Sequence, residues 1–441
     1  MRLFAAAAVA LVILSTNAGA AEKKSAGVES QIESLRDDLR QESERRRELE
    51  KLIDDLTREK DNGQPRQPQE REMDAPPAME MDDEGDAGEP AEESVDRIWK
   101  GMEFAGGVTG VVQGTSAGGG RASSERTGSS YSAAMEMIYH QDDNYYLITS
   151  LTADSGLGGN GKFATDIMPD YGARRTEGRG GAEQVALTQA FFEGLFLERK
   201  LAVNLGKLDI HSLYDENILA GNENTGFLSG ALNRAAGTVG RALDYNNTVG
   251  ARALASLSQW AEAQVIYAHS GLDGLESSPF SVFQFTLRPG LFNLEGNYRF
   301  YAAHDGRVYH DAAGNEKSGL VYGFNFDQFI TDNVGFFFRW SAQAKDVREN
   351  RVTAMYSGGL TLTGGMWGRV DDLFGLGYAK LELNDTPAQP YEGGQGVVEA
   401  YYNVKVNPMV SVSFDVQFHS MLPQPKDRDM TVAGARARID F

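Results

Sequence analysis

Cysteine is absent from the 441 residues of this chain. The chain therefore forms no disulfide bond, carries no thiol nucleophile and offers no thiolate ligand to a metal. Its six histidines do not show the spacing of a helical zinc motif. We expect no metal site and no cofactor, and the sequence contains no recognisable catalytic set.

Basic charge is also scarce. The chain has 42 Lys and Arg residues against 63 Asp and Glu residues, which leaves a formal net charge of -21. Because binding to phosphate backbones requires a basic surface, this balance argues against a nucleic-acid partner.

Long apolar runs are missing except near the start. Residues 3–14 are apolar, but this run is shorter than the ~18 residues that a membrane-spanning helix needs. Arg2 precedes the run, and the small residues Ala18, Gly19 and Ala20 follow it. This order is typical of a secretory signal peptide, so we expect residues 1–20 to be removed during export.

Residues 21–60 predict a periplasmic coiled coil. Apolar residues recur there at alternating spacings of four and three, with charged residues around them, which is typical of a helical seam. A single solvated helix is the alternative. The predicted seam consists of Val28, Ile32, Leu35, Leu39, Leu49, Ile53 and Leu56, with the polar Glu42 and Arg46 in two seam positions.

Residues 61–97 are rich in proline and acidic residues and contain almost no large apolar side chains. Such a composition cannot bury enough surface to offset the entropy lost on ordering, so we expect a disordered linker.

Residues 98–441 show strand periodicity and no convincing helix. Apolar and polar residues alternate in about sixteen short stretches that are separated by turn residues. The expected strands are 101–112, 131–140, 145–153, 185–197, 201–208, 243–254, 260–269, 280–288, 291–301, 319–329, 334–344, 352–362, 373–383, 396–406, 409–419 and 431–441.

The connections between these stretches alternate between short and long. Short links such as residues 289–290 and 407–408 are followed by long Gly-rich or polar segments such as 154–184. An even number of antiparallel strands with tight turns at one end and long loops at the other is the layout of an outer-membrane β-barrel. The predicted fold class is therefore all-β, with about 16 transmembrane strands after the helical segment and the linker.

The last residue supports this prediction. Ala433, Ala435, Ala437, Ile439 and Phe441 fall on one face of the final strand, and Arg436 falls on the other. A closed barrel pairs its last strand with its first, because an open edge in lipid leaves backbone groups unsatisfied. Bacterial outer-membrane barrels commonly end on such an aromatic residue, and this resemblance implies that Phe441 and Ile439 serve as the barrel assembly signal.

Three stretches resemble the carbohydrate-selective porin family of the OprB type. They are "LAVNLGKLDIHSLYDENILAGNENTGFLSGAL" at 201–232, "DDLFGLGYAKLEL" at 371–383 and "VVEAYYNVKVNPMVSVSFDVQFHSMLP" at 397–423, together with the final "IDF". The helical segment and the linker lie outside the family pattern, and "PQPKD" at 423–427 departs from it. The resemblance implies a porin for small polar solutes such as carbohydrates.

A barrel of about sixteen strands leaves an aqueous channel unless something narrows it, and the loop from residue 208 to about 241 is the candidate constriction. Acidic residues on the loop facing basic residues on the wall would set a transverse field. Lys207 shares its strand parity with apolar residues, so a bulge at Gly206 would be needed to turn it inward, and a rim position is the alternative. The predicted constriction consists of Lys207, Asp209, Asp215, Glu216, Arg234, Arg241 and Arg252.

Other motifs do not support an enzyme. The "GTSAG" stretch at 114–118 has the spacing of a nucleophile elbow but lies in a Gly- and Ser-rich loop, without the strand-to-helix turn that this motif requires. A barrel lipase or protease would need a catalytic set at the rim. A barrel that mainly anchors a periplasm-spanning coiled coil is the other alternative to a pore.

These observations predict a protein of the Gram-negative outer membrane with its N-terminal region in the periplasm. The expected partners are outer-membrane lipids and lipopolysaccharide, the barrel assembly machinery, two further copies of the chain in a homotrimer, and small polar solutes such as sugars.

Overall fold

The computed structural model describes residues 101–115, 127–156, 184–234, 248–269, 279–311, 313–345, 347, 350, 352–386, 389–390, 394–422 and 428–441. The predicted signal peptide, coiled-coil seam and linker lie outside the described residues. No helix within the described ranges is long and apolar enough to cross a membrane.

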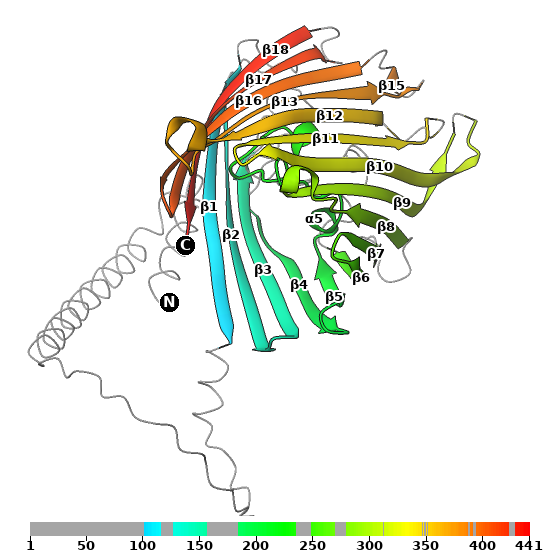
Figure 1. Cartoon of the computed structure of the whole chain (residues 1–441). Coiled ribbons are helices and arrows are strands. Elements are labelled where there is room, and N and C mark those ends of the chain that lie inside the picture. Colours follow the sequence, from blue (N-terminus) through cyan, green and yellow to red (C-terminus); the bar gives the residue numbers. More distant parts are fainter. Residues whose placement is uncertain are drawn as a thin grey trace, which may run out of the picture. The chain divides into compact units, whose positions relative to one another are not determined.

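Sixteen antiparallel strands close into one barrel, which confirms the predicted all-β barrel of about 16 strands (Figure 1). The strands are β1 (Met102–Thr115), β2 (Thr127–Asp142), β3 (Tyr145–Gly156), β4 (Gln184–Phe196), β5 (Leu201–Leu208), β6 (Thr248–Ser258), β7 (Ala261–His269), β8 (Pro279–Leu287), β9 (Gly296–His310), β10 (Glu316–Thr331), β11 (Val334–Gln343), β12 (Val352–Thr363), β13 (Leu373–Leu383), β16 (Gly394–Asn407), β17 (Val410–Leu422) and β18 (Arg428–Asp440).

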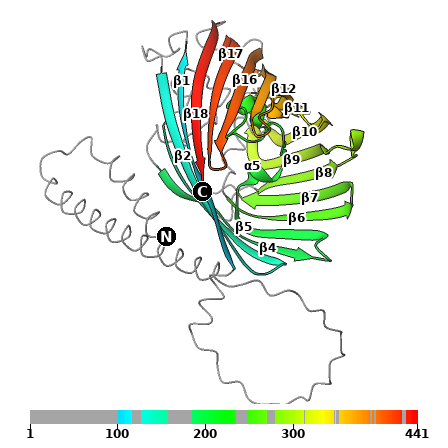
Figure 2. The same cartoon turned by 60° about the vertical axis from the view of Figure 1, so that its left-hand side comes forward.

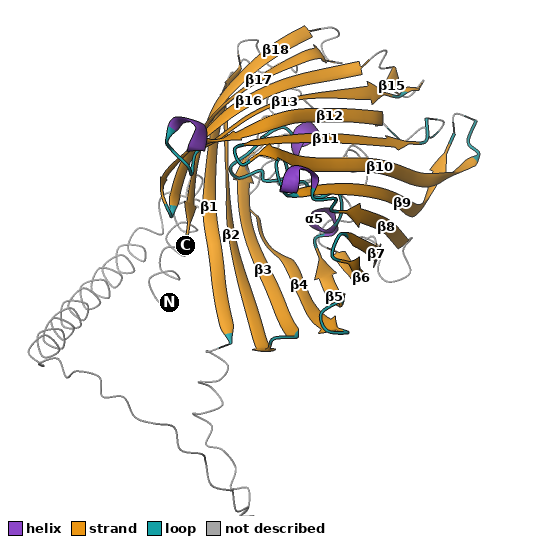
Figure 3. Ribbon diagram, viewed as in Figure 1, coloured by secondary structure: helices purple, strands orange, loops and turns teal. Residues whose placement is uncertain are grey.

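Smaller elements lie in the connections. A two-stranded ribbon of β14 (Asp385–Thr386) and β15 (Gln389–Pro390) follows β13, and the 3-10 turns η3 (Leu291–Asn293) and η4 (Gly364–Trp367) lie in two of the short links. The long connection after β5 holds two one-turn helices, α5 (Ile210–Leu213) and α6 (Gly230–Asn233) (Figure 3). That connection is the loop for which the sequence predicts the constriction.

The strands place mainly apolar side chains outward, and their inward side chains are polar except where the wall packs against the loop. On β17, Phe414, Val416 and Phe418 are exposed, whereas Gln417 between them is 1% exposed. This arrangement is the reverse of a water-soluble protein, because the outer surface of a membrane barrel faces lipid and the inner surface faces water or the loop. Aromatic rings add to the outer surface on β9, β10 and β11, where Phe300, Phe324 and Phe338 lie in contact in a row.

The barrel closes between its first and last strands. Strand β18 lies beside β1 in Figure 2, with Val108 opposite Ile439 in the ladder. The ladder extends to the last residue, because the backbone groups of Gly106 and Phe441 exchange two hydrogen bonds of 3.0 Å. A Cβ atom at Gly106 would lie 2.5 Å from the Phe441 ring, so glycine leaves the space that the ring occupies.

Candidate functional site

The loop that follows β5 begins as an apolar plug against the inner wall. Leu208, Ile210 and Tyr214 are buried in a cluster with wall residues of β7 to β10, among them Phe280 and Tyr301. A backbone turn starts α5, since the Ser212 N–H donates to the Asp209 carbonyl oxygen over 3.1 Å. Apolar contact therefore fixes the first turn of the loop to the barrel interior.

Amide side chains of the wall hold the middle of the loop. Asn325 on β10 donates to the carbonyl oxygens of Asp215 (2.9 Å) and Glu216 (2.8 Å). The Asn217 side chain donates to Asn325 Oδ1 over 2.7 Å. On β8, Gln284 Oε1 accepts from the Asp215 N–H at 3.0 Å. These bonds satisfy backbone groups of an irregular segment that has few partners of its own.

A second apolar cluster holds the far end of the loop. Phe227, Ala231 and Leu232 pack against inward-facing residues of β11, β12, β13 and β16. The Phe227 ring lies edge-on to Tyr401, with ring centroids 4.9 Å apart. On β16, Glu399 accepts hydrogen bonds from the N–H groups of Leu228 (2.5 Å) and Ser229 (2.9 Å).

Two buried arginines of the wall also bind loop carbonyl groups. Arg436 on β18 donates to the oxygens of Glu223 (2.7 Å) and Gly226 (2.9 Å). Arg339 on β11 donates to the oxygen of Leu232 over 2.5 Å. The sequence prediction missed both residues, although their strand parity places them inward. A lone arginine at a polar position of an otherwise apolar strand is the signal that could have identified Arg339.

Asp215 and Arg339 form a buried ion pair. Arg339 Nε lies 3.6 Å from Asp215 Oδ2, and both side chains are almost completely buried. Burial raises the pKa of the Asp215 carboxyl to about 6, and the nearby Arg339 and Asn325 limit that rise. The charge of Asp215 is therefore held inside the loop–wall contact.

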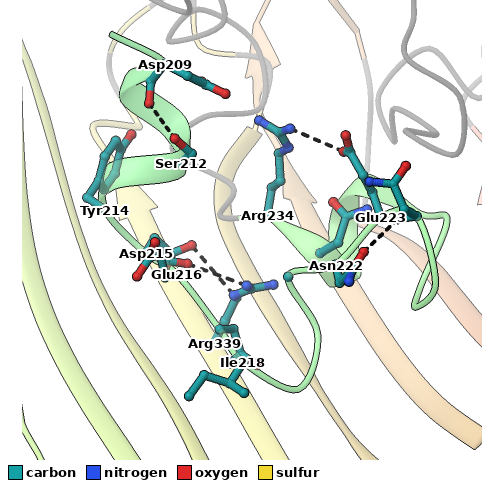
Figure 4. Close-up of a pocket in the computed structure, with 14 residues that line it drawn as sticks. Asp209, Ser212, Tyr214, Asp215, Glu216, Ile218, Asn222, Glu223, Arg234 and Arg339 are labelled. Atoms are coloured by element: carbon teal, nitrogen blue, oxygen red, sulfur yellow. Dashed lines mark hydrogen bonds and ion pairs between the residues drawn. The ribbon is translucent and has the colours of Figure 1, made fainter. Parts of the chain in front are cut away.

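A cavity of about 540 Å³ lies along the loop (Figure 4). Asp209, Asp215, Glu216 and Arg234 line it, so the structure brings four of the predicted constriction residues together. Glu216 is exposed. Arg234 pairs with Glu223, with Nη2 and Oε2 3.2 Å apart. Figure 4 shows this pair across the cavity from Asp209 and Ser212.

The other three predicted constriction residues are not among those that line this cavity. Arg252 on β6 donates to Gln264 Oε1 over 2.7 Å. Lys207 is half-buried on β5. Its partner in the β5–β6 ladder is Val249, whose side chain is exposed, and this ladder has no register shift. Gly206 has a φ of 141°, a conformation that favours glycine, so the backbone is irregular next to Lys207. Arg241 lies outside the described residues.

A second cavity, of about 460 Å³, lies between the loop and the wall made by β1 to β4 and β18. Asp209, Glu223 and Asn224 border both cavities. The Thr109 hydroxyl of β1 donates to Asn224 Oδ1 over 3.0 Å, so the loop reaches the first strand of the barrel. The loop thus touches inward-facing residues around much of the ring and narrows the interior.

The two residues of the predicted assembly signal lie at the end of β18. Ile439 is 49% exposed and Phe441 is 45% exposed, on the face that carries Ala433, Ala435 and Ala437. Within the described ranges, no group of three or more His, Cys, Asp or Glu residues could hold a metal ion.

Comparison with known proteins agrees with this geometry. Residues 120–441 match the family described as carbohydrate-selective porin, OprB family. A search of curated proteins finds no match.

Solved structures show the same fold. The high-pH structure of Pseudomonas putida OprB has a TM-score of 0.64 at 17% identity, covering 79% of this chain and 96% of that one. The low-pH structure of the same protein has a TM-score of 0.50 at 15% identity, covering 79% and 95%. The outer membrane channel DcaP of Acinetobacter baumannii has a TM-score of 0.50 at 10% identity, covering 77% and 97%.

The family match spans most of the barrel and includes the loop whose wall contacts are described above. An enzyme is excluded by the same match, since the family consists of porins. This chain therefore belongs to the OprB family of carbohydrate-selective porins and is an outer-membrane β-barrel porin.

Proposed function

We propose that small polar solutes, sugars among them, cross this porin beside the exposed edge of the loop, and that charged groups at this edge set its ion selectivity. The observation that carries the proposal is the attachment of the loop to β8, β10, β11, β16 and β18 by hydrogen bonds. A loop fixed in this way reduces the open area of the barrel by a constant amount.

Charges at this edge differ in how far they can act on a passing solute. Glu216 is exposed, and the Glu223–Arg234 pair is partly exposed. Asp215 is compensated by Arg339 inside the protein. We therefore assign the largest effect to Glu216, with Asp209, Arg234 and Arg252 next. Lys207 and Arg241 remain among the residues that we propose to set the ion selectivity.

The test compares charge removal at the loop with charge removal elsewhere. The protein is purified in detergent, inserted into planar bilayers and held in a KCl gradient. Glu216→Gln should shift the reversal potential toward anion preference, and Arg234→Gln should shift it toward cation preference. Charge in a narrow, low-dielectric passage acts on every ion that crosses, whereas charge on the outer loops faces bulk solvent and is screened within about 10 Å at ordinary salt.

The matched control lies on β10. Glu316→Gln removes an exposed acid and Lys317→Gln removes a base at the outer end of that strand. If the loop set and this pair produce equal small shifts, the selectivity is set elsewhere and the proposal is wrong.

The assembly of the porin is part of the same proposal. We infer that three copies associate, that residues 21–60 join them in the periplasm as a coiled coil, and that residues 61–97 form the linker to the barrel at 98–441. The signal peptide at 1–20 directs export. Phe441 and Ile439 present the end of β18 to the barrel assembly machinery, and the apolar outer surface contacts lipids and lipopolysaccharide. The exposed ring of Phe441 supports this role.

A further inference from the structure

The wall opposite the loop carries a group of hydroxyl and amide side chains. Ser132 of β2, Ser150 and Thr152 of β3 and Thr188 of β4 line the cavity of about 460 Å³. Gln189 of β4 and Thr109 of β1 complete the set. We call these six residues the hydroxyl wall. Hydroxyl and amide groups both donate and accept hydrogen bonds, and a hydroxyl rotates to suit its partner.

Strand parity explains why these side chains face inward. On β3, Leu147 and Leu151 are exposed on the outer surface, whereas Ser150 and Thr152 are buried. On β4 a register shift occurs opposite Ser150 and Leu151. The parity of β4 changes there, because Leu187 and Phe192 both face outward although they differ by an odd number of positions. This irregularity brings Thr188 to the inner face beside β3.

Hydrogen bonds within the wall fix its geometry. The hydroxyl groups of Thr152 and Thr188 lie 3.1 Å apart, and Thr188 Oγ1 also donates to the Ser150 carbonyl oxygen at 3.1 Å. Ser150 Oγ donates to Glu136 Oε2 over 3.2 Å. A polar surface that is fixed before a solute arrives loses little entropy on binding it.

The charged groups of this wall are engaged by the protein itself. Arg438 Nε lies 2.6 Å from Asp440 Oδ1, and its Nη1 donates to the Thr109 hydroxyl at 3.1 Å. Lys405 Nζ lies 3.7 Å from Asp440 Oδ2. This side of the passage therefore offers hydrogen-bonding groups beside the Arg438–Asp440 pair and the Glu136 carboxylate that Ser150 binds, in contrast to the exposed Glu216 of the loop.

We propose that the hydroxyl wall is the surface that recognises uncharged polyhydroxylated solutes as they pass. The proposal rests on the proposed passage beside the loop and adds a division of labour: the loop selects by charge, and the wall selects by hydrogen bonding. Neutral hydrogen bonds to a wet surface are weak individually, because they replace bonds to water. A solute held in this way can also leave, as conduction requires.

Three substitutions that conserve charge test the wall. Ser132→Ala, Thr152→Val and Thr188→Val each remove one hydroxyl group, singly and together. The measurement is the concentration of glucose, or of a maltodextrin, that halves the ion current through single channels. Each single change should raise it about five-fold, the factor that corresponds to one neutral hydrogen bond. Conductance in KCl and the reversal potential should stay the same.

Thr149→Val is the matched control. Thr149 lies on β3 next to Ser150 but has the outward parity of Leu147 and Leu151. This change should leave the block by glucose unaltered. Gluconate, a charged sugar acid, serves as a second probe, and its block should respond more to Glu216→Gln than to the wall variants.

The outcomes separate the two proposals. In one outcome, Glu216→Gln shifts the reversal potential, but glucose blocks the ion current of the wall variants at the same concentration as in the wild type. The wall proposal is then wrong and the loop proposal stands. If the wall variants weaken the block by glucose and Glu216→Gln has no effect, the loop proposal fails instead. Should the combined variant not assemble, Ser132→Ala alone decides, since Ser132 is half-buried and its replacement is smaller.

Discussion

At the scale of single residues, buried arginines fasten the loop to the barrel. Arg436 is 2% exposed and reaches two loop carbonyl oxygens and the Ser413 hydroxyl. The Glu223 and Gly226 carbonyls that it binds precede the second apolar cluster of the loop. Its loss would leave these buried carbonyl groups without a charged donor.

We predict that Arg436→Met releases this part of the loop. Hydrogen bonds from a charged donor contribute about 1.5 to 3 kcal/mol each, so the free energy of unfolding should fall by about 3 kcal/mol or more. Single-channel current should become larger and noisier, and a protease should cut the loop in folded protein.

Arg288→Met is the control for that change. Arg288 binds two residues of the wall, Glu262 through bonds of 2.5 and 2.9 Å and Asn297 through a bond of 3.1 Å. The single-channel current of this variant should be as steady as that of the wild type. Equal noise in both variants would show that any lost arginine, and not the loop contact, disturbs the current.

The raised pKa of Asp215 predicts a dependence of stability on pH. A carboxyl group with a pKa of about 6 in the folded protein and 3.8 in the unfolded chain stabilises the fold fully below pH 4. This contribution is lost as the pH rises through 6. The difference corresponds to about 3 kcal/mol, since one pKa unit is 1.36 kcal/mol.

Asp215→Asn should remove this dependence. The stability of the wild-type barrel, measured by unfolding in urea at several pH values, should decline relative to that of the variant between pH 4 and pH 7. Parallel pH profiles for the two proteins would contradict the prediction, and the assignment of the raised pKa to Asp215 would then be wrong.

At the scale of elements, β18 joins the closure of the barrel to the position of the loop. Its outward residues continue the apolar surface, and Ile439 pairs with Val108 of β1. Its inward residue Arg436 binds the loop. One strand therefore completes both the wall and the attachment of the loop.

We predict that Phe441→Asp sharply lowers the amount of barrel in the outer membrane while export across the inner membrane continues. The change removes the ring that rests against Gly106 and places a charge on the lipid-facing side, where charge is costly. The measurement is the heat-modifiable band of folded barrel in membrane fractions. Normal amounts of folded barrel in the variant would refute the proposed assembly role of Phe441.

At the scale of the whole molecule, we predict that the barrels are held together in threes. A peptide of residues 22–60 should form helix in a concentration-dependent way by circular dichroism, because a seam of Val, Ile and Leu is buried only when helices associate. Deletion of this segment should lower the apparent mass of the detergent-solubilised protein. A peptide that stays monomeric and unstructured at high concentration would remove the support for the seam.

Much of the barrel could be predicted from the sequence. Alternation in segments such as 409–419 depends on neighbouring residues only, because successive side chains of a strand point to opposite faces. The same local rule identified the lipid-facing parity of Phe441 and the inward parity of Arg436. The contrast between short and long connections then distinguished a membrane barrel from a soluble sandwich.

The attachment of the loop was decided only by the tertiary structure. Arg339 and Leu232 are 107 positions apart, and Arg436 and Glu223 are 213 positions apart. No periodicity relates such residues, since their contact depends on how sixteen strands close around the loop. The sequence alone therefore determined a barrel with a long loop after its fifth strand. The closed ring decided that Asp215 is buried with Arg339, that Glu216 stays exposed, and that a wall of hydroxyl groups faces the loop, because each depends on distant strands meeting across one interior.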